Sequence, residues 1–321
     1  MPRGRKIVKE IELESCMLRG CAEEFYRHNR IKGLAQESQK SYKGYVENFI
    51  KWCGEDTYTE EITTRMLEEY VCYKQEVGLN KAVSIATNMK HIRRFLNFCI
   101  SRGYMEKIEI TIPKFEEELK EPYTEEEMKR LLVRPQTNNW VEWRCWAMTN
   151  YFFSTGQRLS TVLNVQVCHL DLEKATVKLV WNKDKRQKYM PLSSALVKVL
   201  QEYIHISGLE QEDYLFPEYE GKQLKRRSAE DAMTDYNHSR GVDRTGIHLF
   251  RHTFAKCYIQ NGGNPVKLQK LLNHKTIDQT MKYVNMYNSD ISSDLDMFNP
   301  LDNFKRKNYT PTTRRTVLIG A

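Results

Sequence analysis

Residues 246–287 read GIHLFRHTFAKCYIQNGGNPVKLQKLLNHKTIDQTMKYVNMY, and this stretch decides how the rest of the chain is interpreted. Apolar residues recur along it at helical spacing, which predicts several helices packed on a core. Asn264 followed by Pro265 predicts a helix start, because asparagine accepts a capping hydrogen bond and proline suits the first turn. Thr276 and Gln279 have the spacing of a capping box, which would begin a last helix.

The same stretch contains residue types that suit the chemistry of a phosphodiester: His248, Arg251, His252, His274 and Tyr283. Cations can neutralise a phosphoryl group while a hydroxyl attacks it. Each residue also has an ordinary structural explanation, since His248 and Arg251 could cap a helix or pair with nearby acids. Tyr283 could equally be a half-buried helix tyrosine, so none of these residues indicates catalysis when it is taken alone.

A second motif lies upstream, where residues 154–158 read STGQR. The chain therefore contains, in order, T-G-x-R, a basic stretch ending in Pro-Leu, H-x-x-R-H, L-L-x-H and a tyrosine nine positions after that last histidine. This ordered set resembles the tyrosine recombinase (phage integrase) family. The resemblance covers roughly residues 123–287 by motif, and the earlier helices by general shape.

The resemblance implies that the protein cleaves and rejoins DNA strands through a covalent 3′-phosphotyrosine. Two arginines would each donate two N–H bonds to the non-bridging oxygens of the phosphate, and Tyr283 would attack the phosphorus. His248 would accept the tyrosine proton or orient the phosphate, while His274 would bond a non-bridging oxygen. The implied catalytic residues are Arg158, Lys183, His248, Arg251, His274 and Tyr283, with His252 and Asp171 supporting them.

The lysine assignment depends on the one region with strand-like alternation, residues 171–192. A basic turn, Asn182–Gln187, would connect the two strands of a hairpin that ends in Pro191 and a leucine. In the family, a lysine eight residues before that proline protonates the leaving oxygen. Counting back gives Lys183, and Lys185 is the alternative because the length of the turn is open.

Three positions depart from the pattern of the family. Thr161 stands three residues after Arg158, where family members usually have an acid. Asn273 precedes the last histidine, where glycine is usual. His169 stands where another acid is common, and Asp171 follows two positions later. The first and third departures remove carboxylates that would brace the arginine, which bears on full activity and not on the roles of the catalytic residues themselves.

Helical spacing of apolar residues predicts four helices between residues 15 and 105, and this part resembles the core-binding domain of the family. The Arg-Gly-Arg at the start of the chain resembles an AT-hook, which enters an A·T-rich minor groove, although a solvated terminus is the simpler explanation. The basic side chains on the polar faces of these helices could likewise serve only to keep the helix surfaces in contact with water. Those expected to contact DNA are Arg3, Arg5, Lys40, Lys43, Lys81, Lys90, Arg93, Arg94, Lys185, Arg186, Arg226 and Arg227.

The expected fold is mainly α-helical with a small β-hairpin or sheet, arranged as a two-domain clamp around DNA. Thr124 and Glu127 have capping-box spacing and would open the catalytic domain. The C-terminal tail, residues 296–321, would dock on a neighbouring subunit. The simpler alternatives are that it docks on its own chain or stays disordered. The expected order is a basic arm at 1–14, a helical core-binding domain at 15–105, a linker at 106–121, a mixed α/β catalytic domain at 122–295 and the tail at 296–321.

Composition narrows the possible partners. The 321 residues include Lys+Arg 50 against Asp+Glu 42, a formal charge of +8. Between Lys222 and Tyr283 there are 12 basic and 5 acidic residues, so a polyanion would bind there. The 8 cysteines include no Cys-x-x-Cys pair, and the sequence has no zinc spacing, nucleotide loop or membrane-length apolar stretch. We expect a cytoplasmic protein with reduced thiols, no metal and no cofactor.

The expected partners are double-stranded DNA with inverted-repeat core sites and other copies of the chain, two on each site and four in a synapse. Integration, excision, inversion, resolution and transposition all stay open, as do the target sequence and any accessory proteins. Two alternatives share the motifs: a type IB topoisomerase, and a regulator that binds DNA with an inactive site. The nine-residue spacing before Tyr283 favours recombination, whereas Thr161 is the one feature that favours the regulator.

Overall fold

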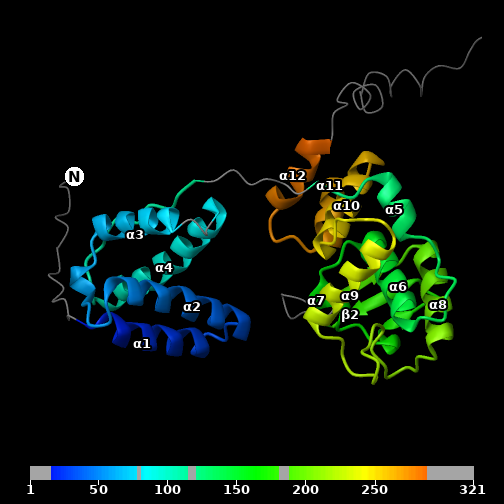
Figure 1. Cartoon of the computed structure of the whole chain (residues 1–321), viewed down its shortest axis with the longest axis horizontal. Helices are drawn as coiled ribbons and strands as arrows, with labels where there is room; N and C mark the ends of the chain where they lie inside the picture. The colour runs from blue at the N-terminus through cyan, green and yellow to red at the C-terminus, as the bar shows by residue number, and fades with distance from the viewer. Residues whose placement is uncertain (1–15, 78–80, 115–120, 181–187, 288–321) are drawn as a thin grey trace, which may run out of the picture. The chain divides into compact units, whose positions relative to one another are not determined.

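The computed structural model describes residues 16–77, 81–114, 121–180 and 188–287, and the chain divides near residue 119 into two compact units (Figure 1). The predicted basic arm, the tip of the hairpin and the predicted tail lie outside the described residues. The fold is mainly helical with one small sheet, as the sequence predicted.

The N-terminal unit is formed by the four predicted helices. A buried cluster that includes Phe25, Phe49, Tyr70 and Phe95 holds them together, and these apolar residues recur at helical spacing in the sequence. The last helix ends at Gly103, whose φ of 80° is readily adopted by glycine. The helices are α1 (Leu18–Ile31), α2 (Gln36–Cys53), α3 (Thr64–Glu76) and α4 (Ala82–Arg102), with a short 3-10 turn at Thr59–Glu61.

The segment after α4 is not a free linker over the whole of the predicted range. Ile108, Ile110 and Ile112 pack against the core of the N-terminal unit. The hydroxyl of Thr64 also donates to the backbone carbonyl of Glu109 at 3.2 Å. Alternating isoleucines let an extended chain bury one edge, so the first part of the predicted linker belongs physically to the N-terminal unit.

The C-terminal unit begins near residue 120 and corresponds to the domain that the sequence predicted as catalytic, so it is called the catalytic unit below. It contains eight α-helices and a sheet within its described residues. The sheet is antiparallel with the order β1-β2-β3, and Val177 pairs with Met190 in its centre. The predicted hairpin is therefore confirmed, with one short strand added. The elements are α5 (Glu125–Leu131), α6 (Trp140–Thr155), α7 (Leu159–Val162), β1 (Leu170–Asp171), β2 (Thr176–Leu179), β3 (Lys188–Pro191), α8 (Ser194–Ser207), α9 (Arg226–Ser239), α10 (Ile247–Gln260), α11 (Pro265–Leu272) and α12 (Asp278–Tyr287).

Helix α6 lies at the centre of the catalytic unit and packs against α8, α9 and α10 (Figure 1). Its aromatic residues, among them Trp143, Trp146, Tyr151 and Phe152, are buried in the core. This confirms that they are packing residues and not a surface for stacking bases. A helix buried on most of its faces holds its C-terminal end in a fixed place, and the T-G-x-R motif begins at that end.

Side-chain caps set the starts of α5 and α11, as the sequence predicted. Thr124 and Glu127 form the predicted capping box, and Asn264 accepts hydrogen bonds from the N–H groups of the first turn of α11. The start predicted from Thr276 is wrong, since α12 begins at Asp278 and the carbonyl of Ile277 accepts its first backbone bonds. Thr276 therefore precedes the capping position by one residue.

Helices α10, α11 and α12 pack on one another around a separate small core. Its buried members are Ala255, Ile259, Leu268, Leu272 and Tyr283. The last helix thus lies against its own chain, and its tyrosine is directed into this group of helices.

Candidate active site

Helix α10 presents three of the predicted site residues on one face. At about 100° per residue, His248, Arg251 and His252 fall within a narrow arc, and the rings of the two histidines lie 5.3 Å apart at 82°. The H-x-x-R-H spacing therefore means that one helix aims all three side chains the same way.

Arg251 is almost completely buried, with 3% of its surface exposed. Its Nη1 donates to the carbonyl of Gly156 at 2.8 Å, and its Nη2 donates to the carbonyl of Leu272 at 2.7 Å. Burial, followed by the nearby charge of Arg158, lowers the pKa of Arg251 to about 10, so the side chain remains a cation at neutral pH. The structure thus holds a positive charge inside the protein against two carbonyl dipoles.

Gly156 allows the close approach that this arrangement needs. It ends α6 in the left-handed conformation, with a φ of 59°. A Cβ at this position would lie 2.5 Å from Cδ1 of Phe254 and 2.6 Å from Cδ2 of Leu272. The glycine of T-G-x-R is therefore required both by the backbone and by the neighbouring helices.

Arg158 follows two residues later and precedes the first turn of α7. It is half-buried, and its charge lowers the pKa of both Arg251 and His274. The structure therefore brings the two arginines of the predicted site together. Thr161, which replaces the acid usual in the family, bonds the carbonyl of Arg158 through its backbone N–H at 2.9 Å.

Sequence reasoning missed a contribution from Gln157. This side chain is buried, with Nε2 2.8 Å from the carbonyl of Leu271 and 3.0 Å from Sδ of Met190. It links the turn before Arg158 to the end of α11 and to β3. Its place at the variable position of T-G-x-R gave no signal, because a glutamine between two motif residues has no characteristic pattern.

His274 lies beside the tyrosine. Its Nδ1 is 2.7 Å from the hydroxyl of Thr280, and its ring is parallel to that of Tyr283 with 6.3 Å between centroids. Burial, followed by the charges of Arg251 and Arg158, lowers the pKa of His274 to about 4. The ring is therefore neutral at physiological pH. Asn273 precedes it at a φ of 52°, a conformation that asparagine tolerates, which explains how it replaces glycine.

Tyr283 is 7% exposed, and its hydroxyl lies 2.9 Å from Nδ1 of His252. The two ring centroids are 5.6 Å apart. The family resemblance implied that His252 only supports the catalytic residues. In the structure, His252 instead contacts the tyrosine hydroxyl that would attack the phosphorus. With its own proton on Nε2, His252 accepts the hydrogen bond from the tyrosine.

Asp171, the other predicted support, makes contacts within its own turn. Asp171 holds its own turn through the backbone N–H of Lys174, at 2.9 Å, and through an ion pair with the same residue at 3.1 Å. His169 bonds the N–H of Gln166 in a local capping box. Lys183 and Lys185 lie outside the described residues, so the choice between them stays a prediction.

The expected DNA-contact residues are surface cations wherever the structure describes them. Lys40, Arg226 and Arg227 make exposed ion pairs with acids three or four positions away on their own helices. Lys43 and Arg94 lie over the rings of tyrosines. Arg3, Arg5, Lys185 and Arg186 lie outside the described residues, while Lys81, Lys90 and Arg93 are exposed.

Fold and site together are those of a tyrosine recombinase. The chain belongs to the phage integrase family: the family model described as "Phage integrase family" matches residues 122–289, and the "Phage integrase SAM-like domain" matches residues 18–115. Among the described residues, none of the helices is long and apolar enough to cross a membrane, and His, Cys, Asp and Glu form no group able to hold a metal ion.

Similar proteins cover most of the chain. A tyrosine recombinase of Pseudothermotoga lettingae is 28% identical over 265 residues, which are 80% of this chain and 90% of that protein. Tyrosine recombinase XerD of Staphylococcus aureus is 24% identical over 87% of this chain and 98% of its own length. The Tn1549 transposon integrase in complex with transposon right end DNA has the same fold, with a TM-score of 0.70, 16% identity and coverage of 84% of this chain and 94% of that one.

Gly156→Ala should destabilise the protein by about 2–4 kcal/mol, because the new methyl group overlaps two side chains and the backbone stays left-handed. Gly208→Ala is the matched control: its φ is 62°, but nothing lies within 4 Å of the added Cβ. We expect the control to cost about 1 kcal/mol. Urea unfolding of both variants measures the difference, and equal losses would contradict the close-packing argument.

The His274 ring should remain neutral in the DNA-free protein down to about pH 5. NMR titration of the ring, assigned with His274→Asn, measures this directly. Because burial lowers its pKa from 6.5 to about 4, the unfolded chain binds this proton more readily, and stability should fall as the pH drops through that range. His274→Asn should lessen the fall. A titration midpoint above pH 6 would show that the site is more open than the structure indicates.

Proposed function

We propose that this protein is a site-specific DNA recombinase that cleaves and rejoins strands through a phosphotyrosine at Tyr283. The observation that carries the proposal is the tyrosine hydroxyl held at 2.9 Å from His252. The same cluster of side chains contains a buried arginine, a second arginine and a neutral histidine. A nucleophile, a proton acceptor and cations therefore lie in one chain, which is the set that phosphoryl transfer needs.

The chemistry follows from these positions. A phosphodiester bound at this cluster would have its non-bridging oxygens neutralised by Arg158 and Arg251, and neutral His274 can add a hydrogen bond. The Tyr283 oxygen forms a bond to phosphorus, its proton passes to His252, and the bond to the 5′ oxygen breaks. A lysine from the hairpin, Lys183 or Lys185, would protonate that leaving oxygen.

The phosphotyrosine bond conserves the energy of the broken phosphodiester. Attack by the 5′-hydroxyl of another strand reverses the step and joins new partners, so no nucleotide cofactor is needed for rejoining. The proposed substrate is double-stranded DNA with inverted core sites, bound by two copies of the chain at each site and four in a synapse. Solved relatives support this proposal, since a λ integrase dimer is bound to a core site and a tetramer to a Holliday junction.

Tyr283→Phe should abolish strand cleavage and leave DNA binding nearly unchanged, because only the attacking oxygen is lost. The test incubates the unaltered chain and the variant with DNA carrying candidate sites, traps the covalent adduct and locates it by mass spectrometry. An adduct on Tyr258 or Tyr287 would refute the assignment. Recombinant products from paired sites, as opposed to relaxed plasmid alone, distinguish recombination from topoisomerase activity.

His252→Gln should slow cleavage at saturating DNA by about 10²–10⁴, the usual contribution of a positioned proton acceptor. Binding of the DNA should change little, since the histidine contacts the tyrosine. His238→Gln, on the exposed part of α9, is the control and should cleave at the normal rate. A loss of roughly twofold or less in the His252 variant would mean that another group accepts the proton.

A further inference from the structure

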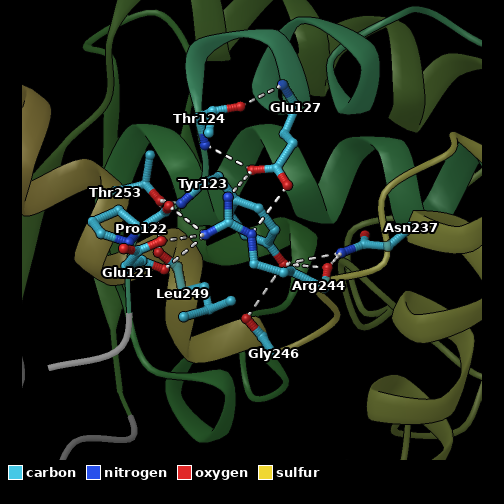
Figure 2. A network of polar contacts seen from close by, with 10 residues as sticks. All are labelled: Glu121, Pro122, Tyr123, Thr124, Glu127, Asn237, Arg244, Gly246, Leu249 and Thr253. Atoms are coloured by element: carbon cyan, nitrogen blue, oxygen red, sulfur yellow. Dashed lines mark hydrogen bonds and ion pairs between the residues drawn. The ribbon is translucent and has the colours of Figure 1, made fainter. Parts of the chain in front are cut away.

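The chain enters the catalytic unit through a polar network around Arg244, which lies between α9 and α10 (Figure 2). Its Nε is 3.0 Å from one carboxylate oxygen of Glu127, and its Nη2 is 2.6 Å from the other. Its Nη1 donates to the backbone carbonyls of Pro122, at 3.0 Å, and Glu121, at 3.3 Å. The guanidinium of Arg244 therefore binds both residues 121–122, where the chain enters the unit, and α5, the first helix of the unit.

Tyr123 connects the same entry point to α10. Its N–H donates to the hydroxyl of Thr253 at 3.0 Å, and its ring lies 4.7 Å from that of Phe250. Its own hydroxyl donates to the carbonyl of Arg244 at 3.2 Å and accepts from Asn237 at 2.9 Å. Figure 2 shows Tyr123 within this network, and the residue is buried, with 2% of its surface exposed.

The contacts fall on the opposite side of α10 from the site. At about 100° per residue, Phe250 and Thr253 point away from His248, Arg251 and His252. The helix therefore lies between the entry of the chain on one side and the catalytic side chains on the other. A rotation or shift of α10 caused by the entering chain would move the catalytic side chains as well.

The chain between the two units is also bound on its N-terminal side, before residue 115. Ile108, Ile110 and Ile112 pack on the N-terminal unit, and residues 121–123 are bound by Arg244 and Thr253. Residues 115–120 separate the two attachments.

The exposure and the geometry of the Arg244–Glu127 contact indicate whether it serves the stability of the fold or the position of its partners. The Arg244 side chain is 31% exposed, and ion pairs that are this accessible to water contribute little to stability. A two-point contact between a guanidinium and a carboxylate is nevertheless directional. Such a contact fixes a geometry more than it raises the stability of the fold.

We propose that Arg244 is a positioning residue, which holds residues 121–123 against the back of α10 and thereby sets the position of His248, Arg251 and His252. The inference rests on the proposed function of the site. The alternative is that the network only stabilises the catalytic unit.

The matched control is Arg240→Gln. Arg240 makes an ion pair with Glu142 at 2.6 Å, is more buried than Arg244, with 15% against 31% of the side chain exposed, and does not touch the linker. If the contacts served stability alone, Arg240→Gln should do at least as much damage as Arg244→Gln. The two variants therefore separate loss of an ion pair from loss of the linker attachment.

The first measurement is limited trypsin digestion of the full chain without DNA. The sequence offers cleavage after Lys114 and Lys120, on either side of the separating segment. Arg244→Gln should be cut there several times faster than the unaltered chain, and Arg240→Gln should not. Equal digestion of the two variants would overturn the proposal, whatever the enzyme does to DNA.

The second measurement is single-turnover cleavage of a half-site at saturating DNA, alongside the affinity for that DNA. We expect Arg244→Gln to lower the cleavage rate about tenfold with affinity unchanged, Arg244→Lys to recover part of the rate, and Arg240→Gln to match the unaltered chain. A faster-digested linker with a normal cleavage rate would reject the coupling. If the unaltered chain forms no covalent adduct, the proposed function fails, and that failure is visible before any variant is compared.

Discussion

The catalytic unit depends on the buried guanidinium of Arg251. Its partners are the carbonyl at the end of α6 and the carbonyl of the last residue of α11, which are groups that a helix cannot satisfy internally. Helix C-termini also carry partial negative charge, so they stabilise a cation without cancelling it as a carboxylate would. The positive charge stays available to an anion, and three helices are fixed to one another by the same two bonds.

The remainder of the site follows from that constraint. Once α10 is fixed, His252 lies where the hydroxyl of Tyr283 enters from α12, and His274 lies beside it with a pKa lowered by burial and by the two arginines. Arg251 stays a cation at neutral pH, and His274 stays neutral among positive charges. In the proposed reaction the arginines would neutralise the phosphate and His252 would accept the proton of the tyrosine.

Much of this could be predicted from the sequence, because helical spacing decides which residues share a face. The H-x-x-R-H motif, the α11 cap at Asn264 and the aromatic core of α6 are local patterns, and the structure confirms them. The contact between His252 and Tyr283 joins residues 31 positions apart, and Gln157 reaches the carbonyl of a residue 114 positions away. No local pattern encodes such pairs. The isoleucines at 108, 110 and 112 did carry a signal, since alternation indicates an extended segment with one buried edge.

The packing of α12 on its own chain has a consequence for mixed assemblies. Tyr283 lies against His252 and His274 of the same chain, so under the proposed function each copy would supply its own nucleophile and proton acceptor. Co-assembly with copies that lack the tyrosine should therefore reduce the number of competent centres in simple proportion to their share. Had the nucleophile been exchanged between neighbours, a copy lacking only its tyrosine could still lend its pocket to an intact copy, and a pair of differently damaged copies would restore one another.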